Sequence, residues 1–373
     1  MDEHRLKELD GVRGVAVLMV MTAHIFSQAE VFWKNGLTEF FSLATAMGLT
    51  GVDFFFVLSG FLITSILLKN KGQQHYFRNF YARRSLRIFP VYYFCITIIF
   101  IGYFVFGNAS IQTVFSTGFW FYSYLHNWIY AINAAPGLYF SHLWSLAIEE
   151  QFYLTWPLVI FFVDRKYLFQ IGTGVILLAL AIRIFVVFGL GNLDIINTFP
   201  YYSTITRIDS LMVGALIAVA FQTDTLKQQL AKDAPKLLLM FFVVVGACVA
   251  VQPASPIWNN RSMLTIGLTV IALLAGALII LLQTQEENHP ARRFFRLPSL
   301  LFFGKYSYAL YLFHWPIASL LITLYGKSNA TGWPVWLSFL IIFYGGTILA
   351  ALLSWNLLEK HALKLKRHFE NKI

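Results

Sequence analysis

The feature that most constrains this chain is a series of apolar runs, each long enough to cross a bilayer. A helix needs about 20 apolar residues to span a hydrocarbon layer of about 30 Å. The 373 residues are 58% hydrophobic and only 12% charged, a composition that excludes an ordinary soluble globular protein. We expect about ten transmembrane helices, at 11–30, 47–68, 88–107, 142–163, 168–190, 201–222, 237–252, 263–283, 304–325 and 333–357. The sequence therefore predicts an all-α, polytopic membrane bundle, a single domain over 1–373 with a tail at 358–373.

The distribution of Lys and Arg predicts how this bundle is oriented. If the N-terminus is cytoplasmic, most of the 28 Lys and Arg residues fall in cytoplasmic loops, and the opposite loops hold only Lys34, Arg261 and Lys327. Cytoplasmic loops carry such an excess. We therefore expect a cytoplasmic (inner) membrane protein with both termini and the tail in the cytoplasm. The same count favours an interfacial or re-entrant segment at 116–133, and it explains the net charge of +10 without nucleic-acid binding.

Two ionisable residues share one face of the first predicted helix. Arg13 and His24 are eleven residues apart, so at about 100° per residue they point in nearly the same direction. Ionisable groups in hydrocarbon are costly unless they face protein or water, which makes them functional candidates. Arg13 could instead extend to the interface, and His24 could be a hydrogen-bonded structural histidine.

Two further groups of charges flank the next predicted helices. Asp53 lies near the start of the second, where it could simply cap the helix. Arg83, Arg84 and Arg87 precede the third, where they could anchor the protein to anionic lipid. Because guanidinium groups bind phosphate oxygens in pairs, the same cluster, and Arg84 with Arg87 in particular, also suits a phosphate-rich ligand.

The fourth predicted helix contains adjacent carboxylates, Glu149 and Glu150. Neighbouring helical residues point about 100° apart, so one could orient a partner while the other forms an ion pair. In the sixth predicted helix, Arg207 and Asp209 could neutralise each other. In the ninth, His314 next to a proline could satisfy a kinked backbone.

The depth of these residues suggests a shared site. Counted from the predicted outer helix ends, His24, Asp53, Glu149 and Arg207 each lie about 9 to 10 Å inside at 1.5 Å per residue. We therefore expect one polar pocket in the outer half of the bundle, with an arginine-lined entrance at the inner face. Cys95 and Cys248 both fall inside predicted helices, so neither a disulfide nor a metal-cluster pattern applies, and we expect no metal site.

A pocket of this kind suits the transfer of a group from a donor on the cytoplasmic side of the membrane to an acceptor on the outer side. Acyl-CoA fits as donor, since its phosphates need cations and its long neutral arm can enter an apolar bundle. His24 would be the general base on an acceptor hydroxyl, and Glu149 or Glu150 could fix its tautomer. An acyl-His intermediate is an open alternative. A proton-coupled transporter, with these groups as a relay, is the competing class, and a lipid-binding structural protein is a third.

Several motifs resemble the acyltransferase-3 family of bacterial membrane O-acyltransferases over essentially the whole chain. They are LDGVRGVAVLMVMTAH, GVDFFFVLSGFLIT, the Arg84 and Arg87 pair followed by IFP, WSLAIEEQFYLTWP, RIDSLMVG, YSYALYLFHWP and SWNLLEKHALK. The resemblance implies transfer of an acyl group, most often acetyl, from acyl-CoA (acetyl-CoA) to an extracytoplasmic or lipid-linked glycan such as lipopolysaccharide O-antigen or exopolysaccharide. It also implies that Arg13 and His24 are essential.

From the residues and the resemblance together, we predict three groups of site residues. The catalytic group is His24, Glu149, Glu150 and Asp53, and the donor-binding group is Arg13, Arg83, Arg84 and Arg87. The substrate-contacting group is Trp144, Ser145, Tyr153, Arg207, Asp209, Tyr308 and His314. Some family members carry a fused SGNH-type esterase domain. We expect the stand-alone form, which acylates its acceptor directly or through a separate partner.

Overall fold

The computed structural model describes residues 7–28, 45–106, 111–134, 141–191, 194–251, 260–328 and 332–369, and these ranges hold helices and no strand. This confirms the all-α prediction. The long helices are α1 (Lys7–Phe26), α4 (Gly51–Asn70), α5 (Tyr76–Phe106), α8 (Trp144–Phe162), α9 (Arg165–Ile184), α11 (Thr204–Ala220), α12 (Asp224–Val251), α13 (Leu268–Thr284), α15 (Pro298–Ser328) and α16 (Trp333–Ser354). The shorter ones are α6 (Ile111–Tyr122), α7 (His126–Ala131), α10 (Ile195–Tyr202), α14 (Pro290–Phe295) and α17 (Lys360–Lys364). Single π turns continue three helices at Phe185–Gly189, Met263–Gly267 and Trp355–Glu359, and 3-10 turns lie at Met47–Thr50, Ser141–Leu143 and Leu365–Phe369.

Nine of the described helical segments are long and apolar enough to cross a membrane, and each overlaps a predicted span. The tenth prediction, 142–163, corresponds to α8, a helix of 19 residues whose two glutamates lower its mean hydropathy. Several helices extend beyond the apolar run that predicted them. For example, α5 begins at Tyr76 because its basic first turns continue the same helix. The segment 116–133 forms α6 and α7, of 12 and 6 residues, which are too short to span.

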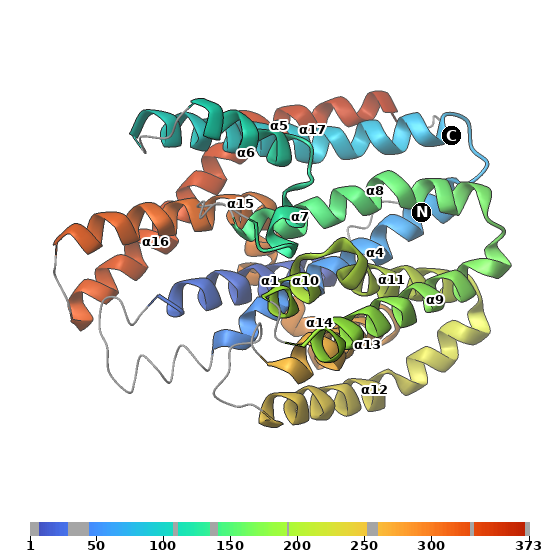
Figure 1. Cartoon of the computed structure of the whole chain (residues 1–373). Coiled ribbons are helices and arrows are strands. Elements are labelled where there is room, and N and C mark those ends of the chain that lie inside the picture. The colour runs from blue at the N-terminus through green and yellow to red at the C-terminus, as the bar shows by residue number, and fades with distance from the viewer. Residues whose placement is uncertain are drawn as a thin grey trace.

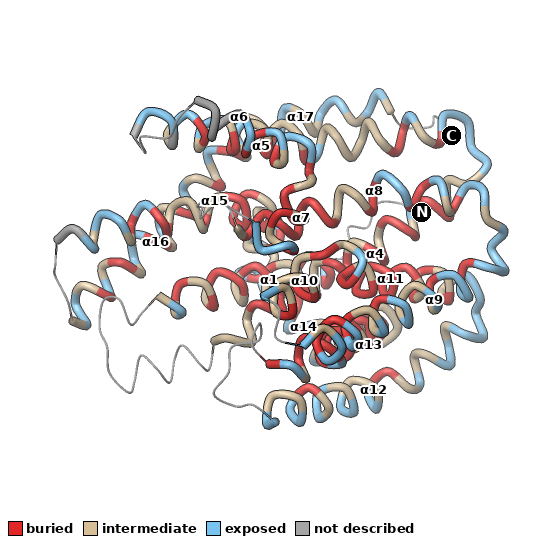
Figure 2. The backbone as a smooth tube through the Cα atoms, in the orientation of Figure 1, coloured by how far each residue is buried: buried red, intermediate tan, exposed pale blue. Residues whose placement is uncertain are grey.

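The long helices run roughly side by side, with α1, α4 and α11 in the middle of the bundle (Figure 1). In the same view, α12 forms the lower edge and α5, α6 and α17 the upper edge. Burial follows this arrangement: most positions of α1, α4, α11 and α13 are buried, whereas α12 is largely exposed (Figure 2). The exposed side chains of α12 include Leu239, Phe242 and Val243. An exposed apolar face of this kind is what a lipid-facing helix presents.

Glycines bring the central helices into close contact. A Cβ on Gly60 of α4 would lie 1.9 Å from the Leu211 carbonyl oxygen of α11, and one on Gly214 would lie 2.0 Å from that of Val57. Small residues allow such close crossings in membranes. Gly60 and Gly214 therefore set the close crossing of α4 and α11.

Close glycine contacts also hold α1 against α15. A Cβ on Gly14 would lie 2.1 Å from the Leu300 carbonyl oxygen, and one on Gly304 would lie 1.8 Å from that of Asp10. The start of α1 is further fixed by Glu8, which forms ion pairs of 2.7 and 2.6 Å with Arg292 and Arg296. The helix that carries Arg13 and His24 is thus held rigidly against α15.

Candidate functional site

A cavity of about 100 Å³ lies between α1, α4, α5, α8 and α15. We call it the central cavity. Its polar lining residues are Arg13, Ser59, Arg84, Arg87, Ser145, Glu149, Glu150, Tyr153, Ser307, Tyr308 and Tyr311. Eight of these residues were predicted from sequence as site residues, and five helices bring them together.

A second cavity, of about 340 Å³, adjoins the central one. Its lining includes Lys69, Arg83 and Lys366, and we call this cavity the basic mouth. We call the side of the bundle on which it lies the basic end. Arg84 and Arg87 line both cavities. They are three residues apart on α5 and share a face, as the sequence predicts. The two arginines therefore stand at the junction between the mouth and the central cavity.

The charged groups of the central cavity are largely without direct ion pairs. Arg13 pairs with Asp10 at 2.8 Å, and Arg84 lies over the ring of Tyr153 with 5.7 Å between the guanidinium carbon and the centroid. Within the described ranges, neither Arg84 nor Arg87 forms an ion pair within 4.0 Å. Glu150 likewise has a buried Oε1 with no hydrogen-bond partner there. Buried polar groups without direct partners are costly, so this lining favours a ligand whose own polar groups hydrogen-bond to it.

The two membrane histidines predicted from sequence contact each other. His24 Nδ1 lies 3.0 Å from His314 Nε2, and His314 Nδ1 lies 2.6 Å from the Tyr311 carbonyl oxygen. The ring of Trp315 packs 4.9 Å from that of His24, measured between centroids. His24 is partly exposed whereas His314 is fully buried, so His24 is the one that a substrate can reach.

A third histidine, His142, contacts this pair and bonds to a backbone carbonyl that a proline leaves free. Pro316 has no N–H to donate to the Leu312 carbonyl one turn earlier, which leaves that oxygen free. His142 Nε2 donates to it at 3.2 Å, and the His142 ring meets that of His314 edge to face at 5.0 Å. His142, to which the sequence assigned no role, therefore satisfies the carbonyl that Pro316 leaves free, while His314 bonds to the neighbouring Tyr311 carbonyl, the kind of backbone role considered for it from sequence. The free carbonyl opposite Pro316 is the signal that predicts a donor there.

Tyr311 connects the histidines to the central cavity. It lines that cavity, and its ring lies 5.5 Å from that of His314 and 5.6 Å from that of His142. Its hydroxyl donates to the His142 carbonyl at 2.6 Å and accepts from Ser145 Oγ at 2.7 Å. The tyrosine thus lies between the cavity and the imidazoles.

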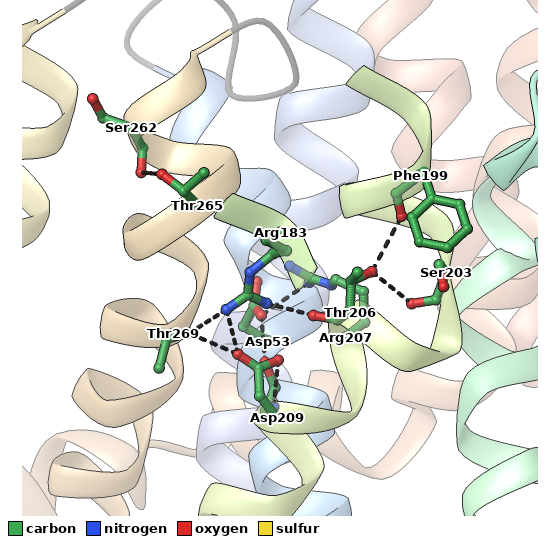
Figure 3. Close-up of polar contacts among 11 residues, drawn as sticks. Asp53, Arg183, Phe199, Ser203, Thr206, Arg207, Asp209, Ser262, Thr265 and Thr269 are labelled. Atoms are coloured by element: carbon green, nitrogen blue, oxygen red, sulfur yellow. Dashed lines mark hydrogen bonds and ion pairs between the residues drawn. The ribbon is translucent and has the colours of Figure 1, made fainter. Parts of the chain in front are cut away.

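Asp53, Arg207 and Asp209 lie in a separate, fully buried network (Figure 3). Arg207 pairs with Asp53 at 2.9 Å, and Asp209 pairs with Arg183 at 2.7 Å. The alternative that Arg207 and Asp209 neutralise each other is therefore wrong, because each pairs across to another helix. None of these residues lines the central cavity.

The guanidinium of Arg207 is also surrounded by aromatic rings. It lies over the rings of Trp144, Tyr201 and Phe56, at 5.5, 5.3 and 5.8 Å from their centroids. Trp144, predicted to contact substrate, therefore contacts this buried cation and does not line the cavity. The single pocket expected from helix depth resolves into three groups: the central cavity, the histidine cluster and the ion-pair network.

Comparison with known proteins identifies the family. A family model described as an acyltransferase domain matches residues 6–355. The chain belongs to the acyltransferase-3 family. It is 29% identical over 370 residues to "O-acetyltransferase OatA" of Staphylococcus aureus, covering 95% of this chain and 56% of OatA. It is 30% identical over 376 residues to "Putative peptidoglycan O-acetyltransferase YrhL" of Bacillus subtilis, covering 94% of this chain and 54% of YrhL.

The chain spans about half the length of these curated relatives. No solved structure matches it. Its family motifs meet at the sites described above: Arg84 and Arg87 where the mouth joins the cavity, the glutamates in the cavity wall, and His24 against His314. The family match and the nine described helical segments of membrane-spanning length together make it a multi-pass member of this family.

Proposed function

We propose that the protein transfers an acyl group, most readily acetyl, from acyl-CoA at the basic end to a hydroxyl of a glycan outside the cytoplasm. One observation carries the proposal. The basic mouth and the central cavity share Arg84 and Arg87, and Tyr311, which lines the central cavity, has its ring 5.5 Å from that of His314, the residue that contacts His24. This sequence of sites supports a route for a long ligand from a cationic surface to an imidazole.

The charges along this route match the parts of acyl-CoA. In the central cavity Arg13 is balanced by Asp10, and Arg84 and Arg87 are balanced by two glutamates, so its net charge is small. The basic mouth adds basic side chains at Lys69, Arg83 and Lys366, and the described residues that line it include no carboxylate. Phosphates therefore prefer the mouth, and the neutral pantetheine arm suits the cavity.

The reaction itself requires one base. Nε2 of His24 takes the proton of the acceptor hydroxyl as the oxygen attacks the thioester carbonyl carbon. The new C–O bond forms, the C–S bond breaks, and the departing CoA thiolate takes the proton back from His24. In this scheme Glu149 and Glu150 counter the cavity arginines, while Asp53, Arg207 and Asp209 hold helices together.

The acceptor is the least defined part of the proposal. The relatives' names include O-acetyltransferases, and that of YrhL refers to peptidoglycan. Together with the predicted orientation, they support a glycan outside the cytoplasm, lipid-linked or polymeric, as acceptor. The multi-pass bundle places the protein in a membrane, for which we propose the inner membrane with cytoplasmic termini.

Purified protein tests this proposal directly. With radiolabelled acetyl-CoA and a peptidoglycan-derived disaccharide peptide or an N-acetylglucosamine oligomer as acceptor, we expect label in the oligosaccharide and release of free CoA. His24→Ala should lower the rate by about 10²-fold or more, as loss of a general base does. His361→Ala, the same change at an exposed position, is the matched control. Uptake of solute by vesicles without covalent change would instead favour the transporter.

A further inference from the structure

We infer that His314 is a positioning residue which holds His24 as the Nδ1–H tautomer and leaves His24 Nε2 free to act as the base. The inference rests on the proposed function, since it specifies which nitrogen of His24 takes the proton. It assigns to His314 a role other than the substrate contact predicted from sequence.

The hydrogen bonds run from His24 through His314 to the Tyr311 carbonyl oxygen, and the direction of each follows from that last acceptor. The Tyr311 carbonyl oxygen can only accept, so His314 Nδ1, 2.6 Å away, carries a hydrogen. A neutral imidazole has one N–H, which leaves His314 Nε2 as an acceptor. His24 Nδ1, 3.0 Å from that nitrogen, must then donate. The remaining nitrogen of His24, Nε2, has a free lone pair.

The ring geometry shows that the contact between the two imidazoles is a true hydrogen bond. The rings lie only 21° from parallel, with centroids 5.2 Å apart. That separation equals the 3.0 Å contact plus one ring radius at each end, so the rings meet edge to edge in nearly one plane. In such an arrangement the N–H of one ring points along the lone pair of the other. Face-to-face stacking would bring the centroids closer than this.

His314 is also held firmly enough to impose a tautomer. It is fully buried on α15 and is in edge contact with His142, which is itself bonded to the carbonyl that Pro316 leaves free. His24 lies on α1, and glycines lock α1 against α15. The two rings are thus fixed by backbone packing before any substrate arrives, as a preorganised site requires.

The same bond serves in the charged state. When His24 Nε2 takes a proton, its Nδ1–H still donates to His314 Nε2, so the imidazolium keeps its partner without any rearrangement. A second histidine can fill the orienting role that a carboxylate fills elsewhere, since it presents one acceptor nitrogen when its other nitrogen is tied to a carbonyl. In this arrangement neither Glu149 nor Glu150 is needed to fix the tautomer.

Nitrogen-15 NMR of the whole protein in lipid, labelled at histidine, tests this inference without relying on activity. The His24 signals are assigned by their loss in His24→Gln. We expect His24 to be protonated at Nδ1 in the wild type. In His314→Met, which removes the acceptor at similar volume, the hydrogen should move to Nε2 in a substantial fraction of molecules. In His314→Gln, whose amide oxygen can stand near the position of Nε2, the Nδ1–H form should persist.

Kinetics provide the second readout. His314→Met should lower kcat by about 10-fold or more and leave the KM for acetyl-CoA unchanged, whereas His314→Gln should recover most of kcat. A His24 protonated at Nε2 in the wild type, or a tautomer unaffected by His314→Met, would overturn the inference. If transfer is absent but the tautomer responds as expected, the positioning role stands and only the proposed function fails. If His314→Met does not fold, the wild-type tautomer alone decides the question.

Discussion

Replacing Asp209 by asparagine should destabilise the protein strongly, although this residue does not line the central cavity. Asp209 accepts from Arg183 at 2.7 Å and from Thr269 at 2.8 Å, and neither the Arg183 nor the Asp209 side chain has any exposed surface. The substitution keeps the shape of the side chain and removes its charge, which leaves a buried guanidinium without a counter-ion. Breaking a buried pair on one side costs about 3–5 kcal/mol.

A matched substitution and a double variant give this prediction its control. Asp164 is 73% exposed and lies 4.0 Å from Lys166, so Asp164→Asn makes the same chemical change at a solvated pair. Its cost should stay below about 1 kcal/mol. The double variant Arg183→Met with Asp209→Leu removes both charges, and it should be close to the wild type in stability because no isolated charge remains.

Reversible unfolding in mixed detergent micelles, followed by circular dichroism, measures these free energies. The reasoning fails if Asp209→Asn lies within about 1 kcal/mol of the wild type, or if the double variant is as unstable as the single one. Affinity for acetyl-CoA offers a second check. It should be unchanged in every variant that folds, because the ion-pair network is separate from the cavity lining.

Two further predictions concern helix packing and donor binding. Gly214→Ala would place a methyl group 2.0 Å from the Val57 carbonyl oxygen, so it should reduce folded yield and thermal stability. The control is Gly246→Ala on α12, where nothing lies within 4 Å of the added methyl group and no loss is expected. Equal thermal midpoints for the two variants would contradict the close crossing. Arg84→Gln should weaken acetyl-CoA binding by about 10- to 100-fold in calorimetric titration, the loss expected for a charge-assisted hydrogen bond, with Arg84→Lys in between. Lys236→Gln, at an exposed position on α12, should bind normally, and an equal loss there would mean that net charge alone governs affinity.

The sequence predicts the helices well because hydropathy and length are local properties. It also places Arg84 and Arg87 on one face, since that follows from helical spacing alone. Helix ends are less predictable. Hydropathy marks where a helix enters the apolar layer, while the hydrogen-bonded backbone continues beyond it, as α5 and α12 do.

Partner choice among the buried charges is where sequence reasoning falls short. Arg207 and Asp209 are neighbours in the chain, yet they pair with Asp53 and Arg183 on α4 and α9. This outcome depends on how deeply each helix is set relative to the next, and glycine contacts such as that of Gly60 decide that depth. Similar depth in the membrane therefore does not establish a common pocket.

The most direct test of the transfer route uses oriented vesicles. Acetyl-CoA is supplied only on the side of the basic end, and a soluble N-acetylglucosamine oligomer is confined to the other side. We predict acetylated oligomer in the compartment that never contained acetyl-CoA, and none when His24 is replaced by alanine. Product formed only when donor and acceptor share one compartment, or formed equally well by His24→Ala, would contradict the route from the basic mouth to the histidine pair.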